Sequence, residues 1–88
     1  MKHRTTLRKP GIEIRKVLAG NVRALRSRLG ISQEELGDIC GLHRTYVGAV
    51  ERAERNVTLS TLEVFSKALG VSVPNLLIPG RQRHDRNL

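Results

Sequence analysis

The stretch from residue 32 to residue 52 constrains the fold of this 88-residue chain more than any other part of it. Ser32 can accept a hydrogen bond from a free backbone N–H of a following helix, and Glu35 can return one to Ser32, which is the capping-box pattern. Apolar residues then recur at helical spacing as far as Gly41, a residue type that readily adopts the left-handed conformation at a helix end. We therefore predict a helix over residues 33–40, a glycine turn, and a second helix over residues 44–52.

The second of these helices carries Val47 and Val50 on its inner face, and two short helices joined by a glycine turn are typical of a helix-turn-helix. The segment resembles the helix-turn-helix of the phage-repressor family, which includes the lambda repressor and Cro and is often called the xenobiotic-response-element family. The matching positions are Gln33, Leu36, Gly37, Cys40, Gly41, Leu42, Val47 and Val50. The family usually has alanine at Gly37, where glycine lets the two helices approach but costs about 1 kcal/mol of helix stability.

Three further helices are expected from apolar spacing and capping residues. The first covers residues 12–29, where Gly20 and Asn21 can break it. Another covers residues 61–69, with Ser60 as its cap and Glu63 completing a capping box. The last covers residues 73–78 after a capping Ser72. These elements predict an all-α fold. The resemblance, which spans about residues 18–79, implies a compact five-helix lambda-repressor-like DNA-binding domain.

Composition and charge set the domain organisation and the kind of partner. We expect a flexible basic arm over residues 1–11, one helix-turn-helix DNA-binding domain over 12–80, and a polar basic tail over 81–88. With 39% hydrophobic and only 2% aromatic residues, the core must be aliphatic. The formal net charge of +8 favours a polyanion, nucleic acid before membrane, although charge alone can also serve solubility. The sequence has no signal peptide or apolar run of membrane-spanning length, so we expect a cytoplasmic protein.

The resemblance implies that the helix over residues 44–52 enters the DNA major groove by its N-terminal end. Helical geometry places Thr45 and Ala49 opposite the core-facing valines, with Arg44 and Tyr46 flanking them. Arg44 is the best candidate for reading a base, because its planar fork fits the O6 and N7 atoms of guanine. The candidate base-reading residues are Arg44, Thr45, Tyr46 and Ala49. The alternative is that this run is ordinary solvated surface.

A second group of residues is expected to contact phosphates or to support the fold. The resemblance implies that Gln33 holds a phosphate beside the start of its helix. The other phosphate candidates are Arg52, Arg55, Asn56 and Thr58. The resemblance also implies a structural ion pair between Arg26 and Glu51.

The resemblance further implies a homodimer, because one domain contacts only half of a two-fold symmetric operator. The expected interface residues are Val73, Leu76, Leu77 and Ile78. The alternative is that most of this apolar surface closes the core of the single chain. Double-stranded DNA and a second copy of the chain are the expected partners, and RNA polymerase is a further candidate.

Within the family, residues 43–71 look most like the controller proteins of bacterial restriction–modification systems, which autoregulate their operon as activators or repressors. An antitoxin that binds a toxin and its own operator is the alternative, and RNA binding is a third option. The enzyme interpretation is weak, because His3, His43, His84 and Cys40 have no metal-ligand spacing and no catalytic motif appears. We therefore expect no catalytic residues, no metal and no cofactor. The single Cys40 excludes an intramolecular disulfide and fits a buried packing position.

Overall fold

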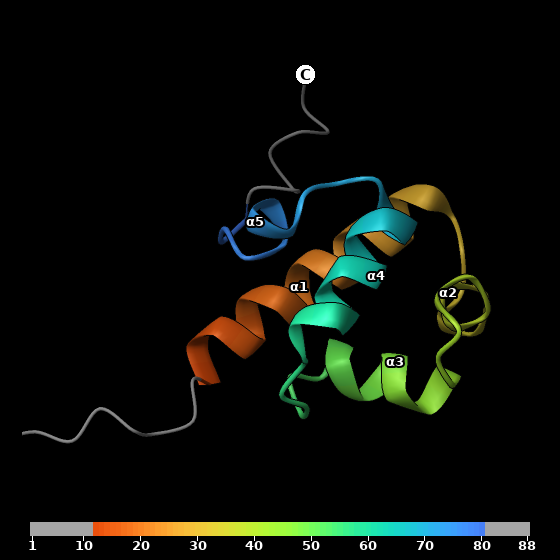
Figure 1. The fold of residues 1–88 in the computed structure, drawn as a ribbon, viewed down its shortest axis with the longest axis horizontal. Coiled ribbons are helices and arrows are strands. Elements are labelled where there is room, and N and C mark those ends of the chain that lie inside the picture. Colours follow the sequence, from red (N-terminus) through yellow and green to blue (C-terminus); the bar gives the residue numbers. More distant parts are fainter. Residues whose placement is uncertain (1–11, 81–88) are drawn as a thin grey trace, which may run out of the picture.

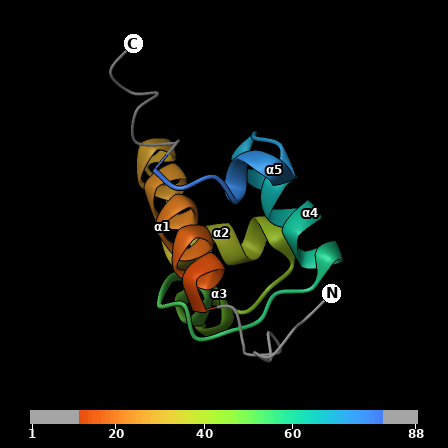
Figure 2. The same ribbon diagram turned by 90° about the vertical axis from the view of Figure 1, so that its left-hand side faces the viewer.

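The computed structural model describes residues 12–80, so the expected basic arm and polar tail lie outside the described residues. Residues 12–80 form five helices and no strand, and Figure 1 shows the helices packed around one centre. They are α1 (Ile12–Leu29), α2 (Gln33–Cys40), α3 (Arg44–Glu51), α4 (Leu59–Leu69) and α5 (Val73–Leu76). The predicted five-helix, all-α fold is confirmed. In both Figure 1 and Figure 2, α3 lies at the bottom of the molecule and α5 near the top.

The core is built from aliphatic side chains of all five helices around a single phenylalanine, Phe65, which has no exposed surface. The buried cluster consists of Leu18, Val22, Leu25, Leu36, Val47, Val50, Leu62, Phe65, Leu69 and Leu76. This confirms the expectation of an aliphatic core. No helix within residues 12–80 combines the length and apolar character needed to cross a membrane.

Helix α1 runs without interruption through Gly20 and Asn21, so the break that these two residues allow does not occur. Asn21 is only 2% exposed, and its side-chain amide donates hydrogen bonds to the carbonyl oxygens of Leu76 at 2.8 Å and Ile78 at 2.9 Å. A polar residue that looks like a helix breaker in the sequence is therefore a tertiary contact. It ties the middle of α1 to the end of α5.

Helix α4 begins earlier than predicted. Its N-cap is Thr58, whose hydroxyl accepts a hydrogen bond from the backbone N–H of Thr61 at 3.1 Å. Ser60 lies inside the first turn, so the predicted Ser60 cap and its capping box with Glu63 are wrong. Both hydroxyl residues are competent caps, and Thr58 is selected because the chain is still extended there, with φ −72° and ψ 161°.

The other helix ends follow the sequence closely. Helix α5 is capped by Ser72, as predicted, but ends at Leu76 rather than at residue 78. Helix α3 ends at Glu51, one residue before the predicted end, and Arg52 is its C-cap.

The turn between α2 and α3 has the predicted chemistry. Ser32 and Glu35 form both bonds of the capping box, and Gly41 has the left-handed φ of 72°. Gly37 is packed more tightly than expected, because a Cβ atom there would lie 2.5 Å from the carbonyl oxygen of Leu42. Glycine at this position lowers the stability of α2, but it allows the turn to pack closely against the helix.

Candidate nucleic-acid interface

Helix α3 presents two faces with different environments. Its inner face is buried through Val47, Val50 and Glu51. Its outer face begins with Arg44, whose side chain is 65% exposed. The Arg44 guanidinium lies 3.9 Å from a carboxylate oxygen of Glu34, a solvated pair of little strength. The N-terminal end of α3 is therefore free to meet a ligand.

The start of α3 is fixed by an unusual cap. The ring Nδ1 of His43 accepts a hydrogen bond from the backbone N–H of Thr45 at 3.1 Å and lies 2.8 Å from the Thr45 hydroxyl. The ring takes the position that serine or threonine usually holds at a helix start.

Two of the candidate residues are brought together at the side of α3. The guanidinium of Arg55 lies over the ring of Tyr46, 4.9 Å from its centroid, which is cation–π geometry. Tyr46 is half-buried, so it supports Arg55 as well as lining the edge of the exposed face. Sequence reasoning named both residues but did not connect them, because the loop between α3 and α4 sets their distance.

A shallow hollow of about 340 Å³ lies between the start of α2 and the outer face of α3. It is lined by Gln33, Arg44, Thr45, Gly48 and Arg52. A Cβ atom at Gly48 would lie 3.1 Å from a guanidinium nitrogen of Arg52 and 3.3 Å from the Gln33 amide oxygen. The structure therefore gathers candidates of both kinds, base-reading and phosphate-contacting, around one concave surface with two arginines. We call it the recognition hollow.

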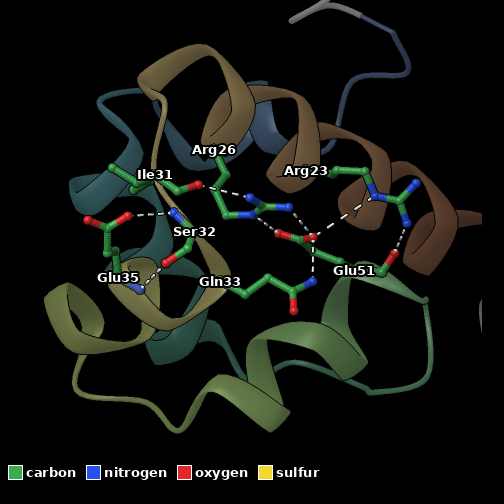
Figure 3. A network of polar contacts seen from close by, with 7 residues as sticks. All are labelled: Arg23, Arg26, Ile31, Ser32, Gln33, Glu35 and Glu51. Atoms are coloured by element: carbon green, nitrogen blue, oxygen red, sulfur yellow. Dashed lines mark hydrogen bonds and ion pairs between the residues drawn. The ribbon is translucent and has the colours of Figure 1, made fainter.

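The predicted ion pair lies behind this surface, and Figure 3 shows it in detail. Arg26 donates two hydrogen bonds to the Glu51 carboxylate, from Nε at 2.7 Å and from Nη2 at 3.0 Å. Glu51 is only 2% exposed, and its hydrogen bond with Arg26 is the largest cause of the raised pKa of Arg26, against the opposing effect of burial. Arg26 also donates to the carbonyl oxygen of Ile31 at 2.9 Å.

The ion pair is part of a wider network that sequence reasoning missed. The Gln33 amide donates to Glu51 Oε1 at 3.0 Å, and Arg23 donates to the backbone carbonyl of Glu51 at 2.8 Å. The one available signal was the spacing of Arg23 and Arg26, which places them on the same side of α1. The residue expected to hold a phosphate, Gln33, is thus oriented by the buried carboxylate.

The other phosphate candidates lie in and beside the loop after α3. Arg52 forms an exposed pair with Glu54, with 3.2 Å between Nε and the carboxylate oxygen. Asn56 is exposed. The hydroxyl of Thr58 accepts from the Thr61 N–H in capping α4 and donates to the Thr61 hydroxyl at 3.0 Å, so a phosphate would compete with this second bond for the Thr58 proton.

The structure corrects one of the expected interface residues. Leu76 has no exposed surface and belongs to the core of the single chain, so it cannot contact a partner directly. The physical reason is that Asn21 draws the end of α5 onto α1. Val73 and Leu77 are half-buried against the core, and Ile78 is 38% exposed.

No group of three or more His, Cys, Asp or Glu side chains within residues 12–80 is arranged to hold a metal ion. Cys40 is half-buried rather than fully buried, and burial raises the pKa of its thiol. A protonated thiol is a poor nucleophile, which fits its packing against the core.

The fold and this surface define a helix-turn-helix domain, and the helix-turn-helix family model matches residues 22–76. The chain belongs to this family and is a DNA-binding transcription regulator. It is 59% identical over 66 residues to Control protein C.SmaI of Serratia marcescens, covering 75% of this chain and 79% of that protein.

Two solved structures extend the comparison. The hypothetical transcription factor NHTF from Neisseria superposes with a TM-score of 0.75 at 44% identity, covering 97% of this chain and 99% of that one. The restriction–modification controller protein C.Esp1396I, solved as a tetramer with its natural 35-base-pair operator, gives a TM-score of 0.65 at 32% identity. That match covers 72% of this chain and 83% of the controller chain. The resemblance to controller proteins expected from the sequence is confirmed.

Proposed function

We propose that this protein is a controller of a restriction–modification operon and binds a two-fold symmetric operator upstream of that operon as a dimer. The likeness to C.SmaI and to the operator-bound C.Esp1396I supports this subclass. The observation that carries the proposal is the recognition hollow, where the exposed Arg44 and Thr45 stand beside the phosphate candidates Gln33 and Arg52.

Each side chain has a role that follows from its position. Arg44 reads guanine through a bidentate bond, since only a weak surface pair holds it in the free protein. Thr45 offers a hydroxyl or a methyl group to a neighbouring base. Ala49 contributes apolar contact, and Tyr46 touches a base edge or a phosphate.

Positioning on the duplex is assigned to residues that frame α3. The side chains that contact phosphates are those of Gln33, Arg52, Arg55 and Asn56. Thr58, at the end of the loop that follows α3, contacts a phosphate as well. Such contacts fix the register of the domain without reading sequence. Because Glu51 already binds the Gln33 amide, this contact starts from an ordered side chain.

The dimer is proposed to form through Ile78 with the exposed parts of Val73 and Leu77. Val73 begins α5, and Leu77 and Ile78 follow its end. Helix α5 lies away from α3 in Figure 1. A dimer presents two recognition helices to two half-sites, which one domain cannot do.

The accompanying proposals concern setting and partners. We propose that the protein is not an enzyme, needs no cofactor, and acts in the cytoplasm beside the DNA. Contact with RNA polymerase is a further proposal, which would make the protein an activator at some operators.

The test is a fluorescence-anisotropy titration with the protein's own upstream duplex and a scrambled duplex of equal length. We expect preferential, cooperative binding to the upstream duplex. Arg44→Ala should weaken that binding by about 1–3 kcal/mol, the value of one bidentate base contact, and leave the scrambled duplex less affected. Lys67→Ala, on the exposed side of α4, is the control. Equal binding to both duplexes by the wild-type protein would refute the proposal.

A further inference from the structure

A second basic hollow of about 280 Å³ lies between α1 and the end of α3. Its charged lining comes from Lys16 and Arg23 of α1 and from Arg52. Between them are Ala19, Gly20 and Ala53, whose short side chains leave room for a group to enter. We call this surface the α1 hollow.

The α1 hollow is strongly positive. Its one acidic lining residue is Glu51, which is 2% exposed and already accepts hydrogen bonds from Arg26 and Gln33. The charge of Glu51 is therefore compensated mainly by Arg26, and of the cations in the hollow Arg23 pairs with it at the long distance of 4.0 Å between Nε and Oε1. Lys16 is exposed and has no ion pair with any residue of the described range.

The two arginines of the hollow are held in place. Arg23 donates to the Glu51 backbone carbonyl at 2.8 Å while its side chain remains 59% exposed. Arg52 pairs with Glu54, but both side chains are more than half exposed, so this pair is weak in water. An anionic oxygen group that enters here meets three cationic side chains and competes with two weak ion pairs, that of Arg52 with Glu54 and that of Arg23 with Glu51.

The position of the hollow points to one kind of anion. Arg52 lines both the α1 hollow and the recognition hollow, so the positive surface continues from α3 onto α1. Successive phosphates of a DNA strand follow one another along the helix axis every ~3.4 Å. A DNA strand whose phosphates lie along the recognition hollow would therefore place its next phosphates beside α1.

We propose that Lys16, Arg23 and Arg52 bind a phosphate of the DNA backbone outside the base pairs that α3 reads. This inference rests on the proposed DNA-binding function and extends the contact surface along the flanking duplex. The contact adds affinity and fixes the angle of the domain, but it carries no sequence information.

The experiment uses Lys16→Gln, because Lys16 has no role in the buried network and its loss should leave the fold intact. Lys67→Gln is the matched control, the same charge change on an exposed position of α4. Binding is titrated against salt with two duplexes. One is the upstream DNA trimmed to the footprint, and the other carries ten added base pairs on each side.

We expect Lys16→Gln to reduce the slope of log affinity against log salt by ~0.9 for each phosphate that is no longer neutralised, or ~1.8 for a dimer. This reduction of the slope should appear with the flanked duplex and be smaller with the trimmed one. Lys16→Arg, which keeps the charge, should have the wild-type slope. The preference for the operator over scrambled DNA should not change.

Two results would overturn the inference. One is a salt slope for Lys16→Gln that equals that of Lys67→Gln on the flanked duplex. The other is an equal reduction on trimmed and flanked DNA, which would place the phosphate within the half-site. If wild-type protein shows no operator preference, the proposed function fails separately, because the salt slope on any duplex still reports the Lys16 contact.

Discussion

Replacing Glu51 by glutamine is the change from which the structure predicts the largest loss of stability. The substitution keeps the size of the side chain and removes the charge to which Arg26 donates two hydrogen bonds. Arg26 has only 17% of its side chain exposed, so it keeps a poorly solvated charge without its partner. Breaking a buried pair in this way costs about 3–5 kcal/mol. A domain of this size loses about 4–8 °C in Tm for each kcal/mol, so Tm should fall by at least about 12 °C.

Circular dichroism during thermal and urea unfolding measures this loss directly. The matched control is Glu54→Gln, the same chemical change in the exposed pair with Arg52, which should cost less than about 1 kcal/mol. Glu51→Ala should be at least as damaging as Glu51→Gln. If the Tm of Glu51→Gln matches that of Glu54→Gln, the reasoning from burial is refuted.

Three further changes test other parts of the fold. Asn21→Ala leaves the carbonyl oxygens of Leu76 and Ile78 without their donor, so the free energy of unfolding in urea should fall by about 1–3 kcal/mol. Amide exchange in α5 should become faster, and unchanged exchange there would contradict this. Gly37→Ala would gain about 1 kcal/mol from helix propensity alone, but its Cβ would lie 2.5 Å from the carbonyl oxygen of Leu42. We therefore expect Tm to fall, and a rise in Tm would show that the turn adapts. Burial raises the pKa of the Cys40 thiol above its ordinary 9.0, so the unfolded thiol ionises first as pH rises. Stability should therefore decline above that pH in wild type and less so in Cys40→Ser, and iodoacetamide should alkylate the native protein more slowly than the urea-unfolded one.

The sequence predicted those parts of the fold that depend on local chemistry. Ser32, Glu35 and Gly41 define the ends of α2 through bonds within a few residues, so their pattern is readable without a structure. The error at α4 has the same origin. Thr58 and Ser60 are both acceptable caps, and the choice between them depends on the path of the loop that precedes them.

The candidate site was predictable in its members but not in its connections. Arg44 and Thr45 are exposed where helical geometry placed them. The bond from Gln33 to Glu51 joins residues 18 apart in the sequence, and its existence depends on how α2 lies against α3. Leu76 was assigned to an interface because apolar spacing cannot tell an inward-facing side chain from an outward-facing one on a helix of four residues.

The division of labour within α3 has an evolutionary consequence. Val47, Val50 and Glu51 hold the helix in the fold, whereas Arg44 and Thr45 make only a weak surface pair and a local cap contact. Replacing Arg44 or Thr45 by other residue types therefore changes the DNA sequence that is read and lowers the stability of the fold only slightly. A lineage that acquires a new operator can adapt by a few surface substitutions on an unaltered scaffold. Substitution of Glu51, by contrast, destabilises the fold itself, so it is selected against whatever DNA sequence the protein reads.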